Sequence, residues 1–255
     1  ISTEIASGMY AYPNPELKPE SGWSSELGIK QGVKIGNWMG FVDVAAFLMR
    51  YDDMMEYSFG YWENQLNGEK GLGFRSVNVG KTQIEGVELS ISGEGSFSKN
   101  TKLNLLMGYT YMNSQSLEPD SVYTLDANGN LLTYNSSSSD PSILKYRYKH
   151  IAKLDAELSH KKTSVGVSLR YNDFMKNIDF IFAAEAFSAF VPGIIESREE
   201  LDGGDFIIDI RTGYQITKEA RLGLVVNNLL NREYTSRPAN MMPPRTIAMQ
   251  LALKI

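Results

Sequence analysis

The chain has 255 residues and a mass of 28.5 kDa, with 42% hydrophobic and 22% charged residues, which excludes a disordered chain and suits one large domain or two ordinary ones. A net charge of -5 and a pI near 5.2 argue against a nucleic-acid partner, which would require a basic patch. The chain has no Cys and only His150 and His160, so we expect no cofactor, no resident metal and no catalytic residues.

The apolar runs and the first residues bear on membrane insertion. The longest apolar stretches, such as Val44–Met49, are about six residues long, far short of the roughly 18 that a transmembrane helix needs. The first residues contain neither a basic segment nor an apolar one, so no secretion signal is visible. We infer either a cytoplasmic protein or a sequence that begins partway through a longer one.

Alternation of apolar and polar residues with a period of two predicts strands along most of the chain. It is clearest at the end, where every odd-numbered residue from 247 to 255 is apolar. The first two strands are the least regular, because Phe41, Asp43 and Phe47 share a face. In chain order the nine predicted strands are 23–33, 38–51, 87–92, 102–111, 152–158, 164–171, 205–211, 221–227 and 247–255.

Two kinds of connection alternate strictly between these strands. Successive antiparallel hairpins put alternate connections at opposite ends of a sheet, so all short turns should lie at one end and all long loops at the other. The short turns are 34–37, 97–101, 161–163 and 217–220, and the long loops are about 52–80, 113–145, 177–204 and 235–244.

This asymmetry and the length of the strands favour an all-β fold, an antiparallel transmembrane β-barrel with short periplasmic turns and long extracellular loops. Charged residues on the polar faces would then line a wet lumen, and tyrosines on the apolar faces would form an aromatic girdle near the long loops. The expected lumen residues are Arg147, Lys153, Asp155, Glu157, Arg170, Asp209 and Arg211, and the expected girdle is Tyr109, Tyr111, Tyr146, Tyr148 and Tyr171.

A soluble β-sandwich or barrel, apolar inside and polar outside, would give the same alternation. We favour the membrane barrel because of the strand lengths and the loop asymmetry. Single-chain bacterial barrels close with an even number of strands, so nine strands should not close alone. The chain is then a portion of a larger barrel whose other strands lie upstream or on another chain.

Four segments of the sequence resemble motifs of the TonB-dependent outer-membrane receptor family. Asn14–Glu20 (NPELKPE) resembles the family's NPxLKPE segment, and Ile84–Leu89 (IEGVEL) resembles its IxGVE strand. Asn227–Tyr234 (NNLLNREY) is similar to the NLLNxxY element, and Pro244–Thr246 opens a similar closing strand. The motifs stand in family order, and the pairing of Arg237-Pro238 with a PPR segment resembles receptors of the Bacteroidetes lineage.

The resemblance implies that residues 1–255 are the C-terminal portion of a roughly 22-stranded barrel in the outer membrane of a Gram-negative cell, with the plug domain, the TonB box and the first strands upstream. Such receptors bind a scarce ligand, such as an iron chelate (siderophore), haem, cobalamin or a glycan, and take it up with energy from the TonB inner-membrane complex. The implied partners are outer-membrane lipid, the upstream plug and strands, the TonB complex, the small-molecule or glycan ligand and a surface lipoprotein.

Ligand contacts are expected where the polar face meets the long loops, because mouth aromatics with a few polar groups suit chelates or sugars. The alternative is that the basic residues there only balance acidic residues inside the lumen. The candidates are Arg147, Lys149, Arg170, Asn172, Tyr57, Tyr61, Trp62 and Phe187.

Several other loop features have an ordinary alternative that we favour. Asp126–Asn130 resembles the start of a calcium loop, but Asn128-Gly129 between two short strands predicts a hairpin turn. Phe180–Val191 has helical spacing up to Pro192-Gly193, which predicts a short amphipathic helix, either a lid over the mouth or loop packing. Acidic residues at 52, 53 and 56 could bind a cation, but a solvated acidic loop is the better interpretation.

The two histidines do not suit haem ligation, since His150 is expected on the apolar face and His160 at a short turn. A passive channel or a structural outer-membrane barrel would have the same pattern of strands as the energy-coupled transporter. A plug domain upstream would distinguish the transporter from these alternatives. An outer-membrane enzyme would need a nucleophile and a base at the strand ends. The chain therefore offers little for catalysis.

Overall fold

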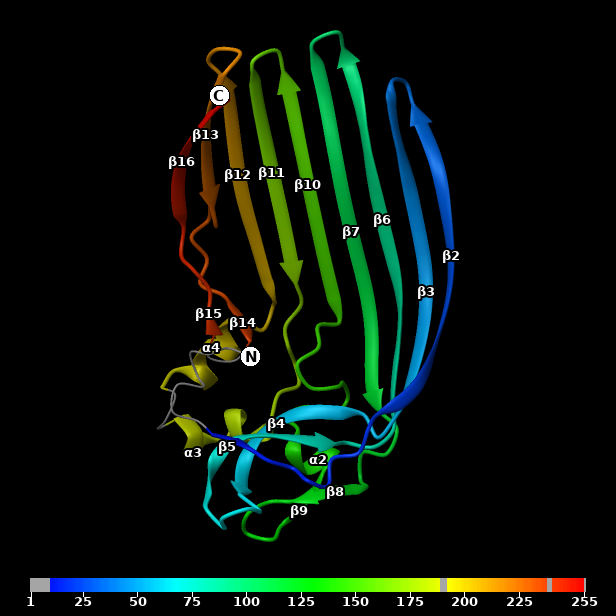
Figure 1. Ribbon diagram of the computed structural model, residues 1–255, viewed down its shortest axis with the longest axis vertical. Coiled ribbons are helices and arrows are strands. Elements are labelled where there is room, and N and C mark those ends of the chain that lie inside the picture. Colours follow the sequence, from blue (N-terminus) through cyan, green and yellow to red (C-terminus); the bar gives the residue numbers. More distant parts are fainter. Residues whose placement is uncertain (1–9, 189–191, 238–239, 255) are drawn as a thin grey trace.

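The computed structural model describes residues 10–188, 192–237 and 240–254. Nine long antiparallel strands form one sheet in the order β16-β13-β12-β11-β10-β7-β6-β3-β2 (Figure 1). All nine predicted strands are confirmed. Their bounds are β2 Ser21–Ile35, β3 Trp38–Asp52, β6 Thr82–Ser98, β7 Thr101–Ser116, β10 His150–His160, β11 Thr163–Asn172, β12 Asp205–Gln215, β13 Ala220–Asn227 and β16 Thr246–Leu253.

The connections divide between the two ends of this sheet as the sequence predicts. The turns β2–β3, β6–β7, β10–β11 and β12–β13 lie together at the upper end in Figure 1, and every long connection lies at the lower end. Positive φ angles at Gly36 (60°) and Lys161 (51°) tighten two of the short turns. The sheet therefore has one end with short turns and one end with long connections.

The strand register separates the side chains into two faces, because directly paired residues lie on the same face. Leu89 pairs with Tyr109, and Tyr109 with Ala152; Ser168 pairs with both Asp155 and Asp209. The predicted alternation thus continues from strand to strand. We call the first the apolar face, with members Leu27, Val44, Leu89, Tyr109, Leu154, Leu169, Ile208, Leu224 and Met249, and the second the polar face, with Lys30, Asp43, Glu88, Thr110, Asp155, Ser168, Asp209, Arg211 and Gln250.

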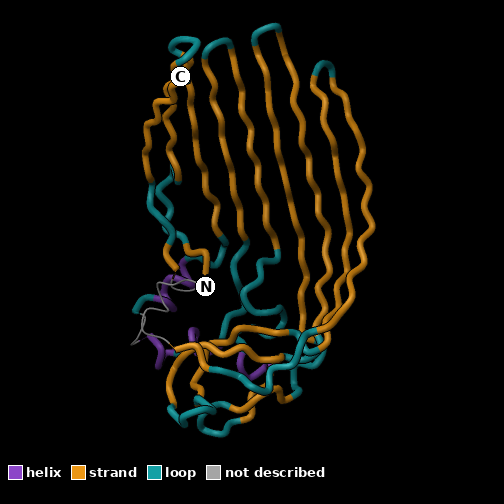
Figure 2. Tube along the Cα trace, in the orientation of Figure 1, coloured by secondary structure: helices purple, strands orange, loops and turns teal. Residues whose placement is uncertain are grey.

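The nine-stranded sheet is a single curved layer, with no second sheet packed along it in the described part of the chain (Figures 1 and 2). Its apolar face is uncovered: Leu27 is 81% exposed and Met249 77%. The soluble sandwich is therefore contradicted, since a sandwich buries this face against another sheet. An apolar surface of this extent requires lipid or another protein surface.

The long connections fold into a layer below the sheet, which we call the loop layer (the described residues 53–81, 117–149, 173–188, 192–204, 228–237 and 240–245). The strand pair β4–β5, joined by β1 in parallel, crosses beneath the long strands (Figure 1). The elements are β1 Tyr10–Tyr12, β4 Met55–Glu63, β5 Lys70–Asn78, β8 Val122–Leu125, β9 Leu131–Thr133, α2 Tyr134–Ser137, the 3-10 helix η1 Phe180–Ala183, α3 Glu185–Ser188, α4 Ile194–Glu200, β14 Thr235–Arg237 and β15 Asn240–Met241.

The buried apolar residues of the chain lie in this layer and at the adjoining strand ends. One cluster is centred on Trp62, Tyr134 and Leu144, which are at most 1% exposed. A second surrounds Phe59 and Ile178. The loops thus have cores of their own and are packed structures.

Two expectations for the long connections are wrong. Tyr146 and Tyr148 are not on the apolar face, because β10 begins at His150 and both lie in the loop layer, where φ of Tyr146 is 59°. The helix expected over Phe180–Val191 is broken: Ala184 is extended between η1 and α3, and α4 begins after Gly193. Residues 189–191 lie outside the described residues.

The NPELKPE segment is explained by hydrogen bonds that hold it along β5. The Asn14 amide donates to the Ser76 carbonyl at 2.8 Å and accepts from Arg75 at 3.1 Å. The Asn78 amide accepts from the Lys18 N–H at 2.8 Å and donates to the Lys18 carbonyl at 2.9 Å. The motif therefore attaches the approach to β2 to the loop layer.

The other two internal motifs have similar structural roles. A Cβ atom on Gly86 of IEGVE would lie 2.6 Å from the Phe47 ring, so this glycine gives room for an aromatic ring on the polar face. Asn228 of NNLLN has a φ of 50° and exchanges two hydrogen bonds with the backbone of Arg232. Asn231 accepts from the Arg245 N–H at 2.9 Å, which joins the end of β13 to the approach to β16.

Candidate functional site

Five charged residues on the polar face of β10, β11 and β12 form ion pairs with each other. Arg211 donates two hydrogen bonds of 2.7 Å to Asp155 and one of 3.1 Å to Glu157. Gly166 permits this arrangement, because a Cβ there would lie 2.6 Å from the Arg211 guanidinium. Arg170 pairs with Asp209 at 3.2 Å. These pairs fit the alternative given above for the basic residues, in which they balance acidic residues inside the lumen.

A buried ion pair joins two segments of the loop layer. The Lys145 ammonium lies 2.9 Å from Asp179, and the two side chains are 1% and 3% exposed. Asp179 also accepts from the Phe59 N–H at 2.8 Å and from the Tyr146 hydroxyl at 2.6 Å. Burial alone would lower the pKa of Lys145, but the charges of Asp179, Tyr123 and Glu56 raise it, so Lys145 is charged.

Glu56 lies beside this pair and its carboxyl is buried. Burial raises the pKa of Glu56 to about 7, against the opposing charge of Lys145. The Tyr134 hydroxyl lies 3.3 Å from one oxygen of Glu56, and the other oxygen is buried with no hydrogen-bond partner among the described residues. The solvated acidic loop expected here is therefore wrong for Glu56.

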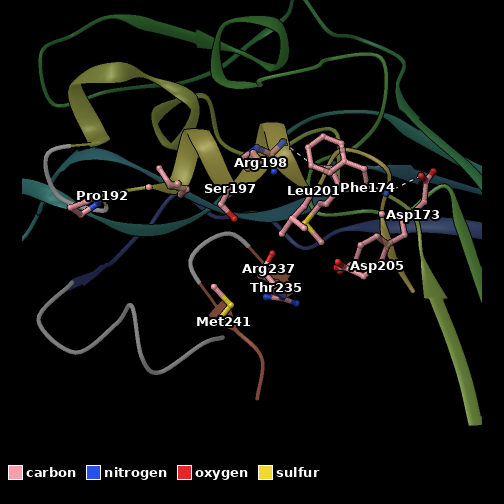
Figure 3. Close-up of a pocket in the computed structure, with 15 residues that line it drawn as sticks. Asp173, Phe174, Pro192, Ser197, Arg198, Leu201, Asp205, Thr235, Arg237 and Met241 are labelled. Carbon is pink, nitrogen blue, oxygen red and sulfur yellow. Dashed lines mark hydrogen bonds between the residues drawn. The ribbon is translucent and has the colours of Figure 1, made fainter. Parts of the chain in front are cut away.

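A pocket of about 260 Å³ opens where the polar face of β12 meets the loop layer. Helix α4, the segment after β11 and the β14–β15 hairpin surround it (Figure 3). Its lining combines apolar side chains with a few charged ones, as ligand sites do. Its lining residues include Tyr148, Phe174, Met175, Ile194, Leu201 and Met241, with the charged Asp173, Arg198, Asp205 and Arg237.

Four of the eight candidate residues lie in or beside β10 and β11. Arg170 and Asn172 are on the polar face, in register with Ile207 and Asp205 of β12. Arg147 and Lys149 precede β10 instead of lying on it, so Arg147 is not a lumen residue of a strand. The Lys149 ammonium lies 5.8 Å from the Tyr111 ring, a residue of the apolar face.

The four aromatic candidates lie in the loop layer, on β4 and α3. Tyr57 stacks on Phe74 at 4.9 Å, and the Tyr61 carbonyl accepts from the Ala127 N–H. Trp62 is 1% exposed and packs in the core cluster. Phe187 is a residue of α3. The eight candidates are thus distributed over β11, the segment before β10, β4 and α3.

The histidines and the Asp126 turn lie as the sequence predicts. His150 pairs with Tyr111 on the apolar face, and His160 lies at the short β10–β11 turn. Asp126 accepts from the backbone of Asn128 and Asn130 in a hairpin turn between β8 and β9. Across the described residues, no three His, Cys, Asp or Glu side chains lie close enough to hold a metal ion.

Sequence reasoning missed the residues of the pocket. Asp205 begins β12, whereas Arg237 and Met241 lie on the two strands of the β14–β15 hairpin, and the resemblance noted at Arg237 in the sequence does not indicate a pocket. The one indication in the sequence is that Asp205 and Arg237 each lie in or directly beside a predicted long loop. The fold brings them together.

Comparison with known proteins agrees with this architecture. The sequence model of the TonB dependent receptor-like, beta-barrel family matches residues 4–229. The chain belongs to this family. No curated protein sequence matches it, and no helix in the described part of this TonB-dependent receptor chain is long and apolar enough to span a membrane.

Solved structures of receptors and transporters share its fold at low identity. The ferric-catecholate import receptor Fiu of Escherichia coli K12 in its closed form is 20% identical with a TM-score of 0.57, over 94% of this chain and 28% of that chain. The outer membrane transporter YddB of Escherichia coli is 14% identical with a TM-score of 0.55, over 98% and 34%. The ferripyoverdine receptor of Pseudomonas aeruginosa is 16% identical with a TM-score of 0.53, over 93% and 27%.

This TonB-dependent receptor chain thus spans about a third or less of the length of these structures. The family places it in the outer membrane as part of a β-barrel of a receptor or transporter. An open sheet of nine strands fits a portion of such a barrel.

Proposed function

We propose that residues 1–255 are the C-terminal barrel portion of an active outer-membrane transporter, which takes up a scarce ligand with energy from the TonB inner-membrane complex. The observation that carries the proposal is the family match over residues 4–229. The proposal is supported by the sheet, which has short turns at one end and long connections at the other. In this assignment the plug and the remaining strands lie upstream in the same protein.

The orientation in the membrane follows from the same features. The apolar face contacts lipid, the polar face lines the lumen, the loop layer is extracellular and the short turns are periplasmic. The packed loop layer, with its buried ion pair and two apolar clusters, is then the outer surface that meets the ligand. Iron chelates are favoured as cargo because the solved structures with this fold include a ferric-catecholate import receptor and a ferripyoverdine receptor.

The runner-up is a passive channel, and energy coupling separates the two. Intact cells of the native host, with and without the full-length gene, are given an iron–catecholate chelate, cobalamin and an oligosaccharide, each radiolabelled. We expect accumulation of one of them against its gradient, lost on deletion of the gene and equally lost when TonB is inactivated. Gene-dependent uptake that persists without TonB would establish the passive channel instead.

A further inference from the structure

The pocket between α4 and the β14–β15 hairpin contains a carboxylate without a partner. The Oδ1 atom of Asp205 is buried without a hydrogen-bond partner among the described residues, although the positive charge of Arg232 acts on this carboxylate. Buried polar atoms in native proteins nearly always have a partner, so an exception needs an explanation. Asp205 is the first residue of β12 on the polar face and lines the pocket, so a ligand there can supply the missing donor.

A second unpaired charge, of opposite sign, lines the same pocket. Arg237 is exposed, and its guanidinium makes no hydrogen bond or ion pair with the described part of the chain. Figure 3 shows the Asp205 carboxylate turned toward the side of the pocket where Thr235 and Arg237 lie. Both charges act on the Tyr148 hydroxyl: burial raises the pKa of Tyr148, Asp205 raises it further and Arg237 opposes the increase.

The other two charged residues of the pocket already have partners. Arg198 donates to the carbonyls of Met175 and Lys176 at 3.0 and 3.1 Å, and its guanidinium lies 4.6 Å from the Phe174 ring. Asp173 accepts from the Phe174 N–H at 2.8 Å. Arg198 and Asp173 thus each have a hydrogen-bond partner within the chain, whereas Asp205 Oδ1 and Arg237 have none among the described residues.

Apolar side chains also line this pocket. Met175 is 7% exposed and Ile194 5%, and Leu201 continues the same surface. At the open side Met241 is 56% exposed. The volume of about 260 Å³ is just below the roughly 300 to 1,000 Å³ of drug-sized sites, which suits a group the size of one or two amino-acid residues.

We propose that this pocket binds a zwitterionic amino-acid or short-peptide group, with its ammonium on Asp205, its carboxylate on Arg237 and its apolar side chain against Met175, Ile194 and Leu201. A guanidinium and a carboxylate each form charge-assisted hydrogen bonds with such ends. The site deepens the proposed function and rests on it, because it makes this part of the loop layer a binding surface for peptide-like cargo.

Three probes separate the two charges of the ligand. Leu-Leu has both ends charged, N-acetyl-Leu-Leu lacks the ammonium and Leu-Leu-amide lacks the carboxylate. Binding of each is measured by calorimetry on the full-length receptor purified from outer membranes, with heat modifiability as the test that every variant is folded. We expect Leu-Leu to bind at least about tenfold more tightly than either derivative, as hydrogen bonds to charged groups would give.

Variants then assign each end to its residue. Asp205→Asn should weaken Leu-Leu and Leu-Leu-amide about tenfold and leave N-acetyl-Leu-Leu unchanged, because the acetylated end has no charge to lose. Arg237→Gln should weaken Leu-Leu and N-acetyl-Leu-Leu and leave Leu-Leu-amide unchanged. The matched control is Asp202→Asn, an exposed carboxylate just after α4 that does not line the pocket, which should change none of the three.

Equal affinity for the three probes, or no binding to folded wild-type receptor, would overturn the pocket assignment. The uptake experiment and the binding experiment measure different properties, so one proposal can fail while the other stands. TonB-dependent uptake of an iron chelate without peptide binding would leave the transporter standing and remove this site. Residue-specific peptide binding in a protein without TonB-dependent uptake would retain the site and remove the transport.

Discussion

Removing the Asp179 carboxylate should open the loop layer while the barrel strands stay intact. Asp179→Ala removes the carboxylate that is hydrogen-bonded to the Lys145 ammonium, which is 1% exposed, and removes the acceptor of the Tyr146 hydroxyl. Removing one partner of a buried ion pair costs about 3 to 5 kcal/mol. At about 4 kcal/mol, the equilibrium for opening the layer shifts by about a thousandfold.

Hydrogen exchange of the full-length receptor in lipid nanodiscs measures this opening amide by amide. The Lys145 N–H, which donates to the Tyr134 hydroxyl at 2.6 Å, and the Tyr146 N–H, which donates to the Asn177 carbonyl, should lose protection, and amides of β10 and β11 should not. Asp202→Ala is the exposed control, and Lys145→Met with Asp179→Leu should restore most protection because no charge is left buried. Unchanged exchange at residues 145 and 146 in Asp179→Ala would refute the reasoning.

Three further predictions concern the loop layer and the sheet. Burial raises the pKa of Glu56 from 4.5 to about 7, so the stability that the protonated carboxyl gives the layer is fully present below about pH 4.5 and is lost as the pH rises through 7, by about 3 kcal/mol. Protection factors, in which the intrinsic exchange rate at each pH is divided out, should be lower at pH 8 than at pH 5, and Glu56→Gln should remove the difference. Leu251→Arg puts a charge on the apolar face at a cost of about 2 to 4 kcal/mol and should reduce the yield of heat-modifiable barrel. Gln250→Arg on the polar face should not reduce it. Equal yields from the two variants would contradict the assignment of the apolar face to lipid. Asn78→Ala removes three hydrogen bonds to the backbone of residues 18 and 53, so limited proteolysis should cut near residue 18 sooner, while Asn67→Ala in the exposed β4–β5 turn should have no effect.

The strands were predictable because their alternation is local and continuous. Each long strand carries its own apolar and polar series, and the strict alternation of short and long connections fixes which end each occupies. The beginning of β6 at Thr82 was missed by five residues, since its first residues also contribute to the loop layer. Phe47 breaks the alternation because it lies on the polar face, where Gly86 beside it leaves room for the aromatic ring.

The loop layer was not predictable, because long-range contacts decide its structure. Tyr146 and Tyr148 continue the alternation of β10 in sequence, yet hydrogen bonds to Asp179 and to the Ser236 carbonyl hold them in the loops. Tertiary contacts of this kind override local pattern. The pocket has the same origin, since Asp205 and Arg237 meet only after the connections around β12 and β14 have folded.

The facing of the strands in a membrane is the central claim, and β11 tests it most directly. The chain contains no Cys, so single cysteines at positions 164 to 170 can carry a spin label in the full-length receptor if the upstream part also lacks reactive thiols or has them replaced. In lipid bilayers, labels at Val165, Val167 and Leu169 should collide mainly with dissolved oxygen, and labels at Ser164 and Ser168 mainly with a water-soluble nickel chelate. The reverse pattern, or no alternation at all, would contradict the membrane barrel.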